Sequence, residues 1–141
     1  MQLKDTSLLK QQVFINGEWL AAADQQTFTV TNPATGETIA NVASATEQQV
    51  EHAVKAAEQA LVTWKLTTAK ERSLLLKKWY QLIIENQEDL AILLSLEQGK
   101  PLTESRGEIL YGASFIEWFA EEAKRAYGDI IPHDKQGRRL V

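Results

Sequence analysis

Within the first 43 residues short apolar stretches are separated by turn residues, with polar and apolar positions alternating over 27–31, and further along the chain hydrophobic positions recur at helical spacing. Near the start, VFINGEWL places Asn16 and Gly17 between apolar flanks, and Asn-Gly favours the positive φ angles of a two-residue hairpin turn. The stretch TFTVTNPATGETIANVA then alternates threonines with Phe28 and Val30 and contains Asn-Pro and Thr-Gly turn residues. The pattern predicts two β hairpins.

Two helices are predicted to follow, each opened by a capping box. Thr46 with Gln49, and Thr68 with Glu71, have the spacing at which a threonine hydroxyl and a Gln or Glu side chain satisfy the first backbone N–H groups of a helix. Apolar residues then recur three or four positions apart, which predicts one apolar face on each helix. These positions are Val50, Ala53, Val54, Ala57 and Leu61, followed by Leu75, Trp79, Leu82 and Ile83.

Further helix signals follow. Asn86 with Asp89 predicts that a helix restarts there, and Gly99 before a proline predicts its end. A last helix is predicted from about residue 103 to residue 127, ended by Gly128. Past it the chain is polar and finishes on Leu-Val, which looks like the start of a strand with no visible partner.

Composition narrows the class of protein. With 141 residues, 44% of them hydrophobic, the chain is long enough for one domain with a core. A net charge of −4 argues against nucleic acid or an anionic membrane as a partner. No apolar run approaches the roughly 20 residues of a membrane span, and the polar N-terminus is unlike a signal peptide. The absence of cysteine excludes disulfides, thiolate chemistry and cysteine zinc sites, and together these features favour a cytoplasmic protein.

Candidate catalytic side chains are few. His52 and His133 are the only histidines, and we interpret both as inert. Acidic residues gather in FIEWFAEEAKR, but Glu121 and Arg125 are four positions apart, which is typical of a salt-bridged, solvated helix face. The short motifs of nucleotide-binding loops, zinc proteases and serine hydrolases do not occur.

An aromatic stripe is the remaining candidate for a site. Tyr111, Phe115 and Trp118 follow one another at helical spacing, with Glu108 one turn earlier. Such stripes usually belong to a core, and the alternative is that part of this one lines a cavity.

Five phrases carry a resemblance to a known family. FINGEW, TNPATGE, LTTAKER, LEQGKP and GDIIP occur in this order, and with this spacing the chain resembles the aldehyde dehydrogenase superfamily from about Leu8 to Val141. Within that superfamily it is most similar to bacterial succinate-semialdehyde dehydrogenases of the NADP-preferring type. Glutarate-semialdehyde dehydrogenases share these phrases and remain an alternative.

The resemblance implies an α/β fold for the whole enzyme, of which this chain is the N-terminal part of the cofactor-binding domain. Residues 1–43 would be a β-rich head, residues 44–132 a helical layer of three to four helices, and residues 133–141 the start of an oligomerisation arm. The chain by itself is then mainly α. A homo-oligomer follows from the same resemblance.

The resemblance also implies a reaction, the oxidation of a small aldehyde to an acid with NADP or NAD. A cysteine thiolate attacks the aldehyde, and water activated by a glutamate hydrolyses the resulting thioester, while an asparagine stabilises the oxyanion. The family places these residues and the main cofactor strands beyond the part that this chain matches, so no catalytic or cofactor-binding residue is assigned. We expect a fragment that neither turns over nor binds cofactor alone. A non-catalytic helical interaction module is the rival hypothesis.

Two sets of residues are carried over as site candidates. The last helix borders the substrate funnel in this family, which makes Glu108, Tyr111 and Phe115 candidates for funnel-facing residues. Some members hold a structural cation near the TNP turn and the acidic residue before QGKP, and Thr31 and Glu97 match those positions.

The helical layer has an apolar face to hide. In the resembled family it packs on a parallel sheet, and without that sheet Leu75, Leu82 and Leu93 would be exposed. Exposed apolar patches favour association, so we expect the isolated chain to be oligomeric or marginally folded.

Overall fold

The computed structural model describes residues 2–132, 134, 136–137 and 139–141. Within them, small antiparallel hairpins precede and follow a set of four α-helices, so the expected mainly α chain with β hairpins is confirmed. The elements are η1 (Thr6–Leu8), β1 (Val13–Ile15), β2 (Glu18–Leu20), β3 (Thr27–Thr31), β4 (Thr38–Ala43), α1 (Glu47–Trp64), α2 (Ala69–Glu85), α3 (Gln87–Gln98), α4 (Leu102–Glu122), β5 (Ile130–Ile131) and β6 (Arg139–Leu140).

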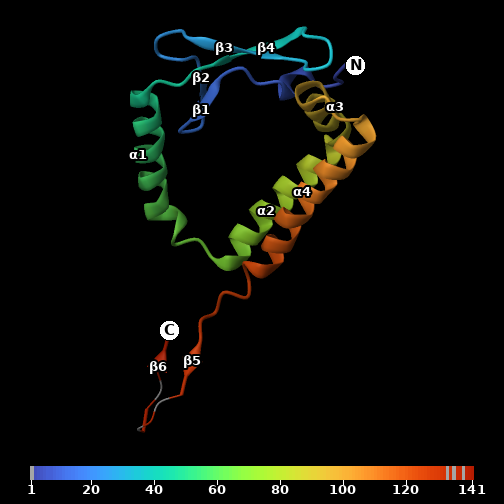
Figure 1. Cartoon of the computed structure of the whole chain (residues 1–141). Helices are drawn as coiled ribbons and strands as arrows, with labels where there is room; N and C mark the ends of the chain where they lie inside the picture. Colours follow the sequence, from blue (N-terminus) through green and yellow to red (C-terminus); the bar gives the residue numbers. More distant parts are fainter. Residues whose placement is uncertain (1, 133, 135, 138) are drawn as a thin grey trace.

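Both predicted hairpins of the first part form. Asn16 and Gly17 make the β1–β2 turn with φ angles of 52° and 86°, the left-handed conformations that this dipeptide tolerates. β3 pairs with β4, and the register shifts between Val30 and Thr31 at the end of β3. Figure 1 shows these hairpins together at one end of the molecule, with α1 descending from them.

The two predicted capping boxes are confirmed. The Thr46 side chain accepts a hydrogen bond from the Gln49 backbone N–H, and the Gln49 side-chain oxygen accepts one from the Thr46 backbone N–H. Thr68 and Glu71 make the same reciprocal pair at the start of α2. Each box satisfies N–H groups that have no partner within the helix, and it therefore sets where the helix begins.

The third helix restarts where expected, but not through a cap. Asn86 makes no side-chain cap bond and instead donates from Nδ2 to the Leu82 carbonyl at 2.8 Å. The Asp89 carboxylate accepts from the backbone N–H groups of Lys4, at 3.0 Å, and Asp5, at 2.8 Å. These two bonds fasten the N-terminal strap, which we define as residues 2–12, to α3. Asp89 itself is buried.

The last helix is shorter than predicted. α4 ends at Glu122 rather than at residue 127, because its hydrogen bonding changes there. The N–H groups of Lys124 and Arg125 reach back only three residues, to the carbonyls of Glu121 and Glu122. Bonds of this 3-10 type wind the chain more tightly than an α-helix and are frequent where an α-helix ends. Gly128 does take a left-handed φ of 75°, but beyond the end of α4.

The expectation of an unpaired strand at the end of the chain was wrong. Ile130 pairs with Leu140 and Ile131 with Arg139 in an antiparallel ladder that extends away from the helices (Figure 1). Backbone bonds between Asp129 and Val141 continue it. The partner strand is only two residues long, so its period could not be recognised in the sequence.

Small residues fill the contact between α2 and α4, whereas α3 buries the larger Ile92 and Leu93, so the expected exposure of Leu93 was wrong. α2 and α4 run antiparallel side by side, and Ser73, Ala113 and Ala120 are buried along them. Ser95 of α3 and Ser105 of α4 share a buried hydroxyl–hydroxyl hydrogen bond of 2.8 Å. The predicted apolar face of α2 therefore does not face α4, and Leu75, Trp79 and Leu82 are exposed. Small side chains let two helices approach closely but carry little hydrophobic signal.

The described chain exposes much more surface than a closed domain. Its accessible area is 10759 Å², whereas a compact monomer of 15.9 kDa is expected to expose about 7,400 Å². None of the four tryptophans is buried. The apolar faces of α1 and α2 thus form as the sequence predicts but are left largely uncovered.

Candidate functional site

Glu108, Tyr111 and Phe115 lie on one side of α4 and line the same groove, of about 620 Å³. The two rings meet edge to face, with centroids 4.9 Å apart at 82°. Tyr111 is 67% exposed and Phe115 is 47% exposed, so neither is a core residue. The structure therefore brings together all three funnel candidates. The remaining lining is Ile83, Leu90, Leu94, Ile109, Gly112, Ala113 and Ile116.

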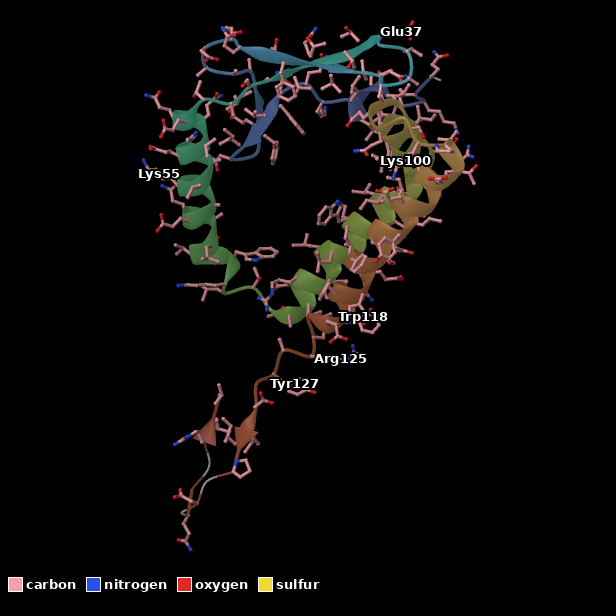
Figure 2. The ribbon with its side chains drawn as sticks, viewed as in Figure 1. Glu37, Lys55, Lys100, Trp118, Arg125 and Tyr127 are labelled. Atoms are coloured by element: carbon pink, nitrogen blue, oxygen red, sulfur yellow. The ribbon has the colours of Figure 1, made fainter. Side chains whose placement is uncertain are left out.

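A charge pair lies beside this apolar wall. The Lys100 ammonium forms an ion pair with the Glu108 carboxylate. Lys100 comes from the connection between α3 and α4, and Figure 2 shows it toward the hairpin end of these helices. Its side chain is 26% exposed and that of Glu108 is 51% exposed. The groove can accept an apolar chain along the rings, and the carboxylate at its edge has a compensating cation.

A second concavity, of about 710 Å³, lies farther along α4 and is lined by Phe115, Trp118, Phe119 and Arg125 among others. Trp118 is 64% exposed, and Figure 2 places it toward the end of α4 away from the hairpins. The aromatic stripe predicted from the sequence thus borders both concavities.

The acidic residues of this region hold helices together. Glu121 accepts from Lys77 of α2 at 2.5 Å and from Lys124 at 2.9 Å. These hydrogen bonds, first that from Lys77 and then that from Lys124, lower the pKa of Glu121 to about 2. The expected ion-paired face is confirmed, but the expected Glu121–Arg125 pair is wrong, since Arg125 pairs with Glu122. A carboxylate with so low a pKa is a poor general base near neutral pH.

A comparable ion pair joins the start of α3 to α4. Arg106 donates to both carboxylate oxygens of Glu88, at 2.6 and 2.7 Å. This bidentate contact lowers the pKa of Glu88 and raises that of Arg106. Two parallel charge-assisted bonds fix the relative position of the two helices that carry the groove.

The structure also brings the two segments of the cation candidates near each other. A side-chain carbon placed on Gly99, just past α3, would lie 2.9 Å from Cγ of Pro33, in the turn after β3. Thr31 ends β3 and Glu97 lies near the end of α3, and both are exposed. No group of three or more His, Asp or Glu side chains suited to a metal occurs in the part of the chain that the structure describes. The cation site stays a prediction.

Other candidates have less support. His52 is exposed on α1, and His133 lies outside the described residues. The oligomerisation arm expected at 133–141 includes residues 133, 135 and 138, which lie outside them too. The sequence did not point to Lys100. Its partner Glu108 lies eight residues away, on the helix that follows the α3–α4 connection, and no periodic pattern links the two residues.

The junction between β4 and α1 lacks the glycine-rich turn of a common phosphate-binding site. Phosphates bind where a strand leads through a glycine-rich turn to a helix N-terminus. Here β4 leads to α1 through Ser44, Ala45 and Thr46, with no glycine, and the first N–H groups of α1 are taken by the capping box. No cofactor phosphate is therefore assigned to this junction.

Comparison with known proteins places these features in a wider group. The model of the aldehyde dehydrogenase family matches residues 19–141. The chain is 57% identical over 141 residues to a glutarate-semialdehyde dehydrogenase of Pseudomonas putida and 50% identical over 141 residues to the NADP(+) succinate-semialdehyde dehydrogenase of Escherichia coli. All of this chain is covered in both cases, but it spans only 29% of the length of each relative.

A solved structure has a closely similar fold. The crystal structure of an aldehyde dehydrogenase from Brucella melitensis biovar abortus superposes with a TM-score of 0.94 at 54% identity. The match covers 97% of this chain and 28% of that one. The open arrangement of hairpins and helices is therefore that of a portion of a larger fold.

Proposed function

We propose, because this chain belongs to the aldehyde dehydrogenase family, that it forms the N-terminal part of an enzyme that oxidises a short semialdehyde to the acid with NADP or NAD. The observation that carries this proposal is the family match over residues 19–141. Succinate semialdehyde is the first candidate substrate. Glutarate semialdehyde is the second, since a relative with that activity is the more similar of the two named above.

Within such an enzyme, Glu108, Tyr111 and Phe115 would border the path of the substrate. Their shared groove and the partial exposure of both rings support this role. The methylene chain of a semialdehyde would lie against the rings, and its terminal carboxylate would have to pass Glu108. Because Lys100 compensates the charge of Glu108, the repulsion between the two carboxylates would be reduced.

The chemical step would belong to residues beyond this sequence. The chain has no cysteine, and cysteine is the nucleophile that the family implies. We therefore expect no NADP or NAD reduction when the 141-residue chain alone is mixed with succinate semialdehyde. Turnover by this chain would contradict that expectation.

The wider assignments are part of the same proposal. Residues 1–43 and 44–132 would be the head and helical layer of the cofactor-binding domain, and residues 133–141 would lead into an oligomerisation arm of a homo-oligomer. We propose a cytoplasmic location. Among the described residues, no helix is both long and apolar enough to cross a membrane.

The funnel role is tested in the complete enzyme with Tyr111→Ala. Loss of one ring contact should raise the KM for the semialdehyde about tenfold and change kcat less, since about 1.4 kcal/mol of apolar contact corresponds to that factor. Tyr127→Ala is the matched control, because Tyr127 is exposed and does not line the groove.

Different results would contradict the funnel role of Tyr111 and the proposed enzymatic activity. Unchanged KM in Tyr111→Ala, with an active wild-type enzyme, contradicts the funnel role alone. An intact, folded wild-type enzyme that oxidises neither succinate nor glutarate semialdehyde contradicts the proposed function itself.

We also propose the structural cation at Thr31 and Glu97. The packing of Pro33 against Gly99, which joins their two segments, supports it. In the complete enzyme, potassium or sodium should raise the melting temperature of the wild type but not of Glu97→Gln. Equal stabilisation of both proteins would contradict the proposal.

A further inference from the structure

Lys100, in the short connection between α3 and α4, is held in place from both sides along the chain. Gly99 ends α3 with a left-handed φ of 72° and donates its N–H to the Ser95 carbonyl at 2.9 Å. Pro101 follows as the N-cap of α4, with a φ of −58°. A side-chain carbon on Gly99 would lie 2.9 Å from Cγ of Pro33, so the β3–β4 turn packs against the same connection. The backbone therefore fixes where the Lys100 side chain starts.

The ammonium of Lys100 acts on the groove beside Tyr111 and Phe115 through Glu108. The two charged groups form an ion pair across eight positions of the chain. Among the described residues that line this groove, Glu108 is the only charged one. The Lys100 side chain is 26% exposed and that of Glu108 is 51% exposed, so the lysine is the more buried member of the pair. The net charge at the edge of the groove is therefore set by this pair.

The two partners of this pair have opposite effects on a charged ligand. Loss of the Lys100 charge alone would leave a carboxylate beside an apolar wall, and that carboxylate would repel an anion entering the groove. Loss of the Glu108 charge alone would leave an ammonium, which would attract the same anion. The interaction between two unit charges near a protein surface is large enough to change binding several-fold over a few ångströms. Charges placed in this way determine which ligand charge a site accepts.

We propose that Lys100 is a specificity-determining residue, which neutralises Glu108 and so lets the groove accept an aldehyde whose far end is a carboxylate. This inference rests on the function proposed above and adds to it the residue that sets the preference for substrate charge. A merely stabilising role of the ion pair has a different signature. Partly exposed ion pairs contribute little to stability, and the loss of either partner would then act on the enzyme in the same direction.

The direction of the change in KM tests the proposal, measured in the complete enzyme with succinate semialdehyde as the substrate. Lys100→Gln should raise KM about threefold to tenfold, and Glu108→Gln should lower it by a similar factor, while kcat changes less in both. The variant that carries both substitutions should have a KM between those of the two single variants. Lys100→Arg keeps the positive charge, so it should show a KM within about twofold of the wild type.

A distant lysine and added salt provide the controls. Lys55 of α1 also pairs with a glutamate, Glu51, at 3.7 Å, and Figure 2 shows it on the opposite side of the molecule from Lys100. Lys55→Gln makes the same change in net charge and should change KM less than about twofold. Raising the ionic strength from about 0.01 M to about 1 M should bring the KM of Lys100→Gln and that of Glu108→Gln closer to the wild-type value, because salt screens the charges. Circular dichroism, measured on every variant, verifies that it is folded.

Changes of KM in the same direction in Lys100→Gln and Glu108→Gln overturn the proposal, and so do changes that high salt leaves intact. If Lys100→Gln does not fold, Glu108→Gln decides by itself, since a KM that rises or stays at the wild-type value overturns the proposal. Equal effects of Lys55→Gln and Lys100→Gln overturn the assignment to this pair. An intact wild-type enzyme that oxidises neither succinate nor glutarate semialdehyde contradicts the proposed function itself. In every other outcome the wild type is active and that function stands.

Discussion

Asp89 offers the sharpest test of how this chain is held together. It is 5% exposed, and its two carboxylate oxygens accept from the backbone N–H groups of Lys4 and Asp5. Asp89→Asn keeps the size of the side chain, but it replaces one acceptor oxygen by an NH2 group that opposes an N–H donor. The N-terminal strap should therefore detach from α3.

The magnitude follows from the bonds that are lost. One charge-assisted hydrogen bond contributes about 1.5–3 kcal/mol. Asp89 also lies in the first turn of α3, where a negative charge adds about 0.3–1 kcal/mol by interaction with the helix dipole. The substitution should lower the free energy of unfolding by about 2–4 kcal/mol. The loss of stability cannot be much larger than this, because the N–H groups of a detached strap form hydrogen bonds with water instead.

The assay is urea unfolding at one fixed protein concentration, since association changes apparent stability. Glu104→Gln is the control, because Glu104 is an exposed acid in the first turn of α4 and should lose only the dipole contribution. Amide exchange at Lys4 and Asp5 should accelerate in Asp89→Asn alone. Stability losses that agree within about 0.5 kcal/mol in the two variants, with unchanged exchange, would refute the role of the carboxylate.

Three further outcomes are expected. Gly99→Ala should lower the free energy of unfolding in urea by about 2–4 kcal/mol, and Gly36→Ala by only about 1 kcal/mol. Both glycines have left-handed φ angles, of 72° and 74°, but only at Gly99 would the added carbon meet a proline ring. Equal losses of stability in the two variants would exclude that contact. Ser105→Ala should lower the free energy of unfolding by about 1–3 kcal/mol, because it leaves the buried Ser95 hydroxyl unpaired. The double variant with alanine at both Ser95 and Ser105 should lose less stability than Ser105→Ala alone, and a greater loss in the double variant would contradict this. The folded pKa of Glu121 is about 2, below the usual 4.5, so its ion pairs stabilise the fold above pH 4.5 and this contribution is lost as the pH falls toward 2. In Glu121→Gln, the urea midpoint should therefore depend less on pH between 4.5 and 2. An unchanged dependence of the midpoint on pH would contradict this.

Local signals in the sequence were sufficient to predict most of the elements. Thr68 and Glu71 form their capping box because both partners lie within four residues, so nothing distant is needed. Gly99 ends α3 for the same kind of reason, since its left-handed φ suits glycine. The Asn16–Gly17 turn is equally local.

Contacts between distant residues were not predictable from one sequence. Lys77 and Glu121 lie 44 positions apart, and no periodic pattern connects them. An amphipathic pattern indicates which face avoids water but not which neighbour covers it. For α2 it selected the side of Trp79, whereas the side that meets α4 is marked by Ser73, a small polar residue with no hydrophobic signal.

The candidate groove shows the same limit. Spacings of three and four residues predicted that Glu108, Tyr111 and Phe115 share one side of a helix, and they do. The other lining comes from Ile83 of α2 and from Leu90 and Leu94 of α3, on helices that the sequence does not connect to them. Its assembly depends on packing between helices, which periodicity does not encode.

The strap has a consequence for how the protein is made. Its bonds to Asp89 join residues 85 and 84 positions apart, so the first residues to leave the ribosome wait for a partner synthesised much later. At about 5–20 residues per second, that interval is roughly 4–17 s. The β1–β2 and β3–β4 hairpins and α1 can fold within it, because their contacts are local. Lys4 and Asp5 are thus among the first residues synthesised, but they can bind Asp89 only after α3 has been made.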